Sequence, residues 1–158
     1  MSKAEIFENE RATGYNQFVQ TWIPNYHHFL DCLPKLLGET SSKNLLAVGC
    51  VLHFLDDNGN KLNLLKDIAD RLVSGAAFVM LDITGDKKQI RQNLKILRLL
   101  LPDGLNEEQI NNRLNRIESE LFVVSEERLS ELLQEAGFEP PLRFFQSSVY
   151  MGWLTKKK

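Results

Sequence analysis

A glycine, a cysteine and a histidine gather at the end of a short apolar run, and they are the first residues that could do chemistry. Gly49 and Cys50 close the run 43–50, and His53 follows three residues later. A glycine lets the backbone approach a ligand closely, a thiol can act as a nucleophile, and an imidazole can carry a proton near neutral pH. A site at the end of this run would therefore include Gly49, Cys50 and His53.

The same groups also have plainer explanations, and both interpretations stay open here. The sequence shows no base paired with Cys50 that would activate a thiol nucleophile. His53 is equally compatible with a partly buried histidine at the end of a strand. Asp82 ends the apolar run 76–83, where an α/β protein places its site, but it can also be structural. The catalytic residue is therefore unknown from the sequence.

Two further pairs are better explained by ordinary structure. His27 and His28 would point about 100° apart on a helix, and no third metal ligand is evident beside them. Asp56 and Asp57 could act as a carboxylate pair, but they begin the segment 56–60, whose residues are typical of a turn. We therefore expect no metal site.

An aromatic stripe marks the N-terminal segment 11–37. Spacings of three and four residues place five rings on one helical face: Tyr15, Phe18, Trp22, Tyr26 and Phe29. Such a stripe is either core or the cover of a ligand cleft, and Tyr15 is kept as a candidate ligand contact on the second interpretation. Pro24 and Pro34 are expected to split the segment or to begin new helical turns.

Strands alternate with helices along the rest of the sequence. The apolar runs 43–50 and 76–83 predict strands buried on both faces, and the first run continues through 51–55. Helical spacing and capping residues predict helices over these ranges: 61–73, 87–101, 106–120 and 125–136. Two short strands, 142–146 and 148–155, are expected to pair antiparallel. This order predicts one α/β domain, 1–158, with a helical segment 11–37 and an α/β core 43–158.

Composition excludes several classes of function. The 158 residues carry a formal net charge of −2, which gives no broad attraction for nucleic acid or an anionic membrane. No stretch of about 20 apolar residues predicts a membrane span, and residues 1–11 do not resemble a secretory signal. Cys32 and Cys50 have no metal-binding spacing and suit a reducing compartment, so we expect a cytoplasmic protein.

Three segments in this order resemble class I S-adenosylmethionine (SAM) methyltransferases that act on small molecules. The segment 44–50 resembles the first strand of that family and the start of its glycine-rich loop. The segment 52–82 resembles the fourth strand, the next helix and the fifth strand. The segment 125–154 resembles the last helix and the terminal antiparallel hairpin. The resemblance implies a Rossmann-like fold, SAM as cofactor, and Gly49, Cys50, His53 and Tyr15 as residues near it.

The sequence departs from this family directly after Cys50. The family continues there with two more glycines, a helix, a second strand ending in an acid that binds the ribose, and a third strand. Here Val51 follows at once, and Ala47 stands where the family usually has an acid. The sequence thus predicts an internal deletion between the first and fourth strands, with SAM binding impaired or absent.

The deletion also predicts the shape of the sheet. The family has strand order 3-2-1-4-5-7-6, so about four strands would remain, in the order fused 1/4, 5, 7, 6, with the last pair antiparallel. The fused strand would then lie at an edge, where we expect two chains to pair as a homodimer or to exchange an element. Two functions stay open: a small-molecule methyltransferase with weak or no activity, or a non-catalytic, self-associating α/β remnant.

Overall fold

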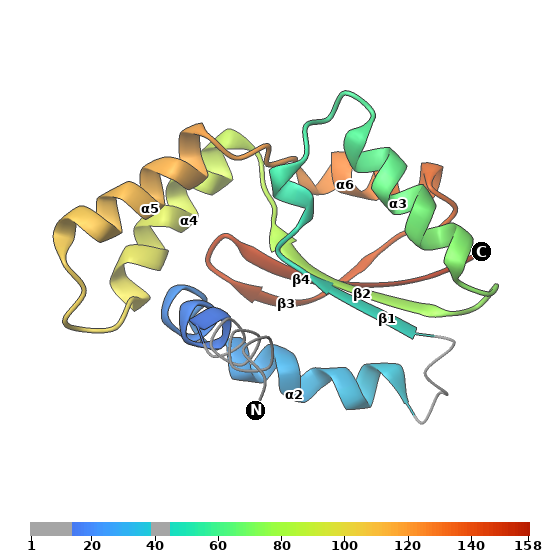
Figure 1. Ribbon diagram of the computed structural model, residues 1–158, viewed down its shortest axis with the longest axis horizontal. Coiled ribbons are helices and arrows are strands. Elements are labelled where there is room, and N and C mark those ends of the chain that lie inside the picture. The colour runs from blue at the N-terminus through green and yellow to red at the C-terminus, as the bar shows by residue number, and fades with distance from the viewer. Residues whose placement is uncertain (1–13, 39–44) are drawn as a thin grey trace, which may run out of the picture.

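The computed structural model describes residues 14–38 and 45–158 of the chain. One mixed sheet of four strands, in the order β1-β2-β4-β3, lies at its centre (Figure 1). The strands are β1 (Leu45–Gly49), β2 (Ala77–Ile83), β3 (Leu142–Ser147) and β4 (Tyr150–Lys156). β1 is parallel to β2, and β4 runs antiparallel to both of its neighbours, β2 and β3. This order and these directions confirm the reduced methyltransferase-like fold expected from the sequence.

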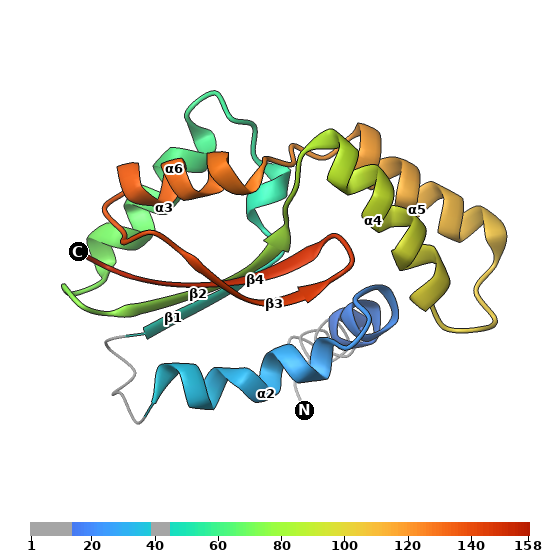
Figure 2. The same cartoon turned by 180° about the vertical axis from the view of Figure 1, so that it is seen from behind.

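Helices cover both faces of the sheet, as Figures 1 and 2 show. One face carries α3 (Asn60–Arg71) and α6 (Glu126–Glu135), and the other carries α2 (Tyr26–Leu37). The helices α4 (Lys87–Leu100) and α5 (Glu107–Ser119) pack against each other beyond the end of β2. A short 3-10 helix, η1 (Leu52–Phe54), follows β1, and residues 14–22 are helical.

The alternation of side chains in β2 divides the core into two clusters. Phe78 and Met80 pack with the helices α3 and α6, whereas Val79, Leu81 and Ile83 pack toward α2 and α4. All five side chains are at most 2% exposed. A strand with large apolar residues on both sides needs a helical layer on each face, and this is why its sequence is continuously hydrophobic.

Close packing between α2 and the terminal hairpin depends on Gly152 of β4. A Cβ atom at this position would lie 2.9 Å from the Cβ of Phe145 and 3.3 Å from the ring of Phe29. The Phe29 ring also stacks on Phe144, with ring centroids 5.8 Å apart. The glycine therefore allows α2 to approach the sheet closely.

Helix starts follow the capping residues found in the sequence. Asn106 accepts hydrogen bonds from two backbone N–H groups at the start of α5, and Ser125 accepts one from Arg128 N at the start of α6. Asp86 and Gln89 form a capping box at the start of α4. The predicted helices and the terminal hairpin are confirmed, with ends shifted by one or two residues.

Two predictions about the backbone were wrong. The apolar run 45–55 does not form one strand, because β1 ends at Gly49, Cys50 adopts a left-handed conformation (φ 52°), and η1 follows. Pro34 does not interrupt the N-terminal helices but lies inside α2, whereas the chain breaks at Pro24 as expected. The predicted segments 11–13 and 43–44 lie outside the described residues.

Candidate functional site

Three of the four candidate residues meet at the carboxyl ends of β1 and β2. Gly49 pairs with Leu81, and the next N–H, that of Cys50, donates to the carbonyl of Leu81 at 2.6 Å. The hydroxyl of Tyr15 lies 3.9 Å from the position of a Cβ atom on Gly49. The N-terminal helix at residues 14–22 thus brings Tyr15 to the end of the edge strand.

The fourth candidate, His53, faces the carboxylate of Asp82. Its Nδ1 is hydrogen-bonded to Asp82 Oδ1, and the backbone N–H of Leu52 donates to Asp82 Oδ2 at 2.7 Å. The N–H of Ile83 also donates to Oδ1, at 2.7 Å. His53 and Asp82 are 3% and 2% exposed, respectively. Asp82 therefore lies at the carboxyl end of β2 as expected, but its carboxylate serves to hold η1 against the sheet.

A buried lysine that was not among the sequence candidates completes this attachment. Lys61 is 1% exposed, and its Nζ donates to the carbonyl of Leu52 at 2.6 Å. Burial lowers the pKa of Lys61, and the nearby charge of Asp82 opposes that shift. A signal was present, because Lys61 lies four and eight positions before Leu65 and Ala69, the other two buried residues of α3.

The thiol of Cys50 is poorly suited to nucleophilic chemistry. Burial and, to a smaller extent, the charge of Asp82 raise its pKa to about 12, against the opposing charge of Arg113. A thiol with this pKa is protonated at neutral pH, whereas the nucleophilic form is the thiolate. The geometry therefore favours the plainer interpretation of Cys50.

A second polar cluster lies on the α5 side of the same strand ends. Arg113 of α5 donates from Nη2 to the hydroxyl of Tyr150 at 3.1 Å, and its Cζ lies 5.1 Å from the centroid of the Phe18 ring. Tyr150 is fully buried, and burial raises its pKa while Arg113 opposes the shift. No sequence pattern marks this cluster, because α5, β4 and residues 14–22 are distant along the chain.

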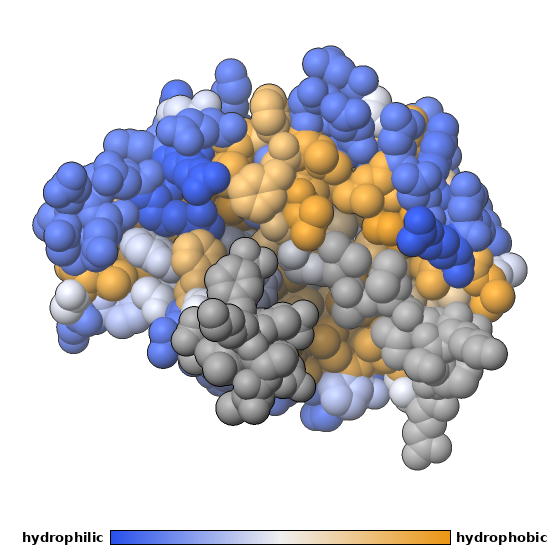
Figure 3. Space-filling model, viewed as in Figure 1, coloured by the Kyte–Doolittle hydropathy of each residue, from blue (hydrophilic) through white to orange (hydrophobic). Residues whose placement is uncertain are grey.

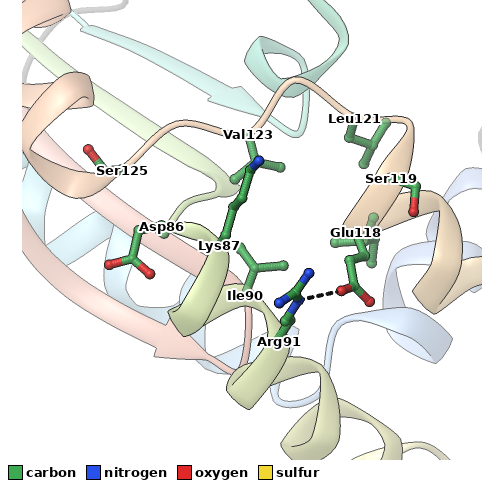
Figure 4. A pocket seen from close by; sticks show the side chains of 11 residues that line it. Asp86, Lys87, Ile90, Arg91, Glu118, Ser119, Leu121, Val123 and Ser125 are labelled. Carbon is green, nitrogen blue, oxygen red and sulfur yellow. Dashed lines mark hydrogen bonds and ion pairs between the residues drawn. The ribbon is translucent and has the colours of Figure 1, made fainter.

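A hollow of about 460 Å³ lies between the start of α4, the end of α5 and the connection that leads to α6 (Figure 4). Apolar side chains such as Ile90 and Val123 line it, and Arg91 pairs with Glu118 at 2.7 Å between α4 and α5. None of the four candidate residues lines this hollow. It therefore lies beside the strand-end site and does not form part of it.

The remaining candidates from the sequence either lie exposed on a helix or stabilise local structure. His27 and His28 are exposed on α2, and Asp56 accepts hydrogen bonds from Asn58 N and Asn60 Nδ2, as expected of a turn. Asp57 binds Arg128, and the Arg128 guanidinium lowers the pKa of that carboxyl. Within residues 14–38 and 45–158, no three His, Cys, Asp or Glu side chains gather in a way that could hold a metal ion.

Comparisons with known proteins give structural similarity only. No protein-family model matches the sequence, and no curated protein matches it. In the described ranges no helix is long and apolar enough to cross a membrane.

Solved methyltransferases are among the similar structures. Human N-acetylserotonin methyltransferase in complex with SAM is 17% identical, with a TM-score of 0.49, over 77% of this chain and 32% of that one. The pyocyanin biosynthetic protein PhzM is 12% identical, with a TM-score of 0.49, over 78% and 33% of the two chains. An O-methyltransferase family 2 protein from Planctomyces limnophilus, in complex with apigenin, is 14% identical, with a TM-score of 0.48, over 78% and 32%. The chain spans about a third of the length of these proteins.

Proposed function

We propose that this chain is a protein of methyltransferase lineage in which binding of SAM is impaired or absent. The observation that carries the proposal is the short connection from β1 to η1. Only Cys50 and Val51 separate the two elements, and the next N–H, that of Leu52, already donates to Asp82. Backbone N–H groups after a strand can bind a nucleotide only while they remain free to point at it.

The polar side chains at this strand end are also occupied. Asp82 accepts hydrogen bonds from the backbone N–H groups of Leu52 and Ile83 and bonds to His53, so little of its capacity remains for a ligand. No acid stands on a neighbouring strand beyond β1 to accept ribose hydroxyls, because β1 is the edge of the described sheet. The residues present therefore do not fit SAM.

Calorimetric titration with SAM, and separately with its demethylated product, tests this proposal. We expect no heat of binding and no rise in the melting temperature at millimolar ligand, because a ligand that binds the folded state must stabilise it. Saturable binding of either compound with micromolar affinity would contradict the proposal and restore the enzyme interpretation.

The second candidate function is self-association of a non-catalytic chain, and the unprotected edge at β1 favours it. The sheet has two edge strands, β1 and β3. β3 carries an irregularity in its register between Arg143 and Phe145, a feature that protects an edge from pairing. β1 has the sequence LLAVG and regular parallel pairing on its β2 side. Its outer backbone groups need a strand as partner, and the β1 of a second copy provides one.

An apolar patch continues this edge. Val51, Phe54 and Phe122 are 41%, 52% and 51% exposed, and Phe122 N donates to the carbonyl of His53, which joins the two parts of the patch. Figure 3 shows hydrophobic residues over η1, with hydrophilic surface at α4 and α5 to one side of them. A homodimer about β1 would cover both the outer side of this strand and these side chains.

Light scattering coupled to gel filtration tests the homodimer. We expect a dimer at micromolar concentration, and a monomer for the double variant Val51→Lys, Phe54→Glu, which places charges in the patch. Leu142→Glu is the matched control, because Leu142 is 68% exposed but lies on the opposite edge strand. A wild-type chain that is monomeric at these concentrations would remove this candidate.

A further inference from the structure

The guanidinium of Arg113 has a buried N–H donor for which the described residues provide no acceptor. The Nε of Arg113 is buried and has no hydrogen-bond partner within the described parts of the chain. Arg113 also lacks a carboxylate partner there, whereas other arginines of the helical layers are paired, including Arg91 with Glu118 and Arg128 with Asp57. An unused donor on a buried charged group costs free energy, about 1–3 kcal/mol, unless an acceptor arrives.

The neighbouring hydroxyl offers a second donor beside the first. The Nε and Nη2 protons of an arginine lie along one edge of the guanidinium, the edge that binds carboxylates through two parallel hydrogen bonds. Nη2 of Arg113 donates to the Tyr150 hydroxyl at 3.1 Å. The hydroxyl accepts this bond, so its own proton is free for an acceptor, and none is found for it in residues 14–38 and 45–158. Nε–H and O–H thus form a pair of adjacent donors.

The charges around this pair favour an anion. The positive charge of Arg113 lowers the pKa of Tyr150 by more than the negative charge of Asp82 raises it. Asp82 is in turn held by its own donors, the N–H groups of Leu52 and Ile83. A single negative charge placed beside Arg113 would therefore be attracted.

Exposed aromatic rings lie between the buried donors and the solvent. The Phe18 ring lies over the guanidinium, and Phe18 remains 43% exposed. Tyr15, 54% exposed, lies one helical turn before it and reaches Gly49 at the end of β1. Because Nε of Arg113 and the Tyr150 hydroxyl are buried, a ligand has to displace these rings to reach them, and its apolar body would then pack against the rings.

We propose that Arg113 and Tyr150 bind the carboxylate of a small organic acid, with one oxygen accepting from Nε of Arg113 and the other from the Tyr150 hydroxyl. The aromatic side chains Tyr15 and Phe18 contact the apolar part of the ligand. This binding site requires neither SAM nor the missing strands, so it is independent of whether the chain binds the cofactor.

Calorimetric titration with benzoate and with benzamide tests the site on the full chain. The two probes have the same shape, but only benzoate carries a charge and two equivalent acceptors. We expect benzoate to bind and benzamide to bind at least about tenfold more weakly, because charge-assisted hydrogen bonds are roughly twice as strong as neutral ones. Equal affinity for the two probes, or no binding of benzoate at millimolar concentration, would overturn the proposal.

Variants locate the binding to these two residues. Arg113→Gln removes the charge, Arg113→Lys keeps the charge but removes the paired donors, and Tyr150→Phe removes only the hydroxyl. We expect benzoate affinity to fall with each, most for Arg113→Gln. Arg116→Gln is the matched control, since Arg116 lies on the same helix but is 52% exposed and faces Glu120. If Arg113→Gln does not fold, the benzoate affinities of Arg113→Lys and Tyr150→Phe test the site instead. Wild-type affinity for benzoate in both variants would overturn the assignment.

Discussion

His53 and Asp82 are hydrogen-bonded inside the protein, and this bond joins η1 to the end of β2. The two residues are 29 positions apart in the sequence, and neither exposes more than 3% of its surface. The carboxylate also accepts from Leu52 N, so both the backbone and a side chain of η1 are fixed by one acid. The conformation of the segment after Cys50 therefore depends on Asp82.

Replacing Asp82 by asparagine should destabilise the fold strongly. The amide has one acceptor oxygen in place of two, so one of the N–H groups of Leu52 and Ile83 would face an NH2 group. We expect the free energy of unfolding to fall by about 2–4 kcal/mol, which urea denaturation followed by circular dichroism would measure. Asp103→Asn, at an exposed position, should change it by less than about 0.5 kcal/mol. Equal effects of the two substitutions would contradict the role given to Asp82.

Lys61 should matter for stability although lysines usually lie at the surface. Lys61→Ala removes the hydrogen bond from Nζ to the carbonyl of Leu52, which keeps only the Leu55 N–H as a donor, and it opens a cavity beneath α3. We expect a loss of about 2–4 kcal/mol in the free energy of unfolding. Lys66→Ala on the exposed face of the same helix is the control and should be nearly neutral. A nearly neutral Lys61→Ala would show that Nζ reaches solvent.

Stability should fall in alkaline solution because of Cys50. Its pKa is raised from 9.0 to about 12 in the folded protein. Above pH 9 the unfolded chain loses the thiol proton while the folded chain keeps it, so the folded state binds more protons and stability decreases as pH rises. The expected slope approaches about 1.4 kcal/mol per pH unit between pH 9 and 12.

Urea denaturation at pH 8, 9 and 10 measures this slope. Cys50→Ala should remove most of the decrease, because it removes the group that titrates. Cys32→Ala, which replaces the other free thiol and leaves Cys50 in place, should retain it. An unchanged slope in Cys50→Ala would assign the alkaline loss to other groups, such as the buried Tyr150.

Gly152 should tolerate no side chain. A Cβ atom there would lie 2.9 Å from Phe145 Cβ and 3.1 Å from the Phe144 ring, so the hairpin or α2 would have to move. We expect Gly152→Ala to cost about 1–3 kcal/mol in the free energy of unfolding. Gly14→Ala is the control, because nothing lies within 4 Å of its added methyl group and it stands in a helix. That control should be neutral or slightly stabilising.

Local signals predicted most of the fold. The caps Asn106 and Ser125, the apolar run of β2 and the spacing of α3 each depend on neighbours in the sequence, so their pattern could be recognised there. The strand order followed from the resemblance to a known family and is confirmed by the pairing of β1, β2, β4 and β3.

Interactions between distant residues account for what could not be predicted. Leu52 and His53 form η1 instead of extending β1 because Asp82 binds both, and no local pattern contains that bond. Arg113 and Tyr150 lie 37 positions apart, so their contact depends on how α5 packs against β4. Gly49 and Cys50 were candidates because they close an apolar run that the sequence marks, and Tyr15 was a candidate because of the aromatic stripe; its place beside Gly49 depends on packing between distant segments.

The position of β4 between β2 and β3 also determines how the protein can fold. Its pairs with β2 join Ile83 to Tyr150 and Ala77 to Lys156, across the whole of α4, α5 and α6. The pairs of β1 with β2 close a loop of roughly half that length, and the pairs of β3 with β4 close a short turn. Long loops are entropically costly to close, so the two local pairs should form first and the insertion of β4 should limit the rate of folding. Until that step, β2 and β3 have no strand between them, and the chain is most exposed to pairing with another molecule.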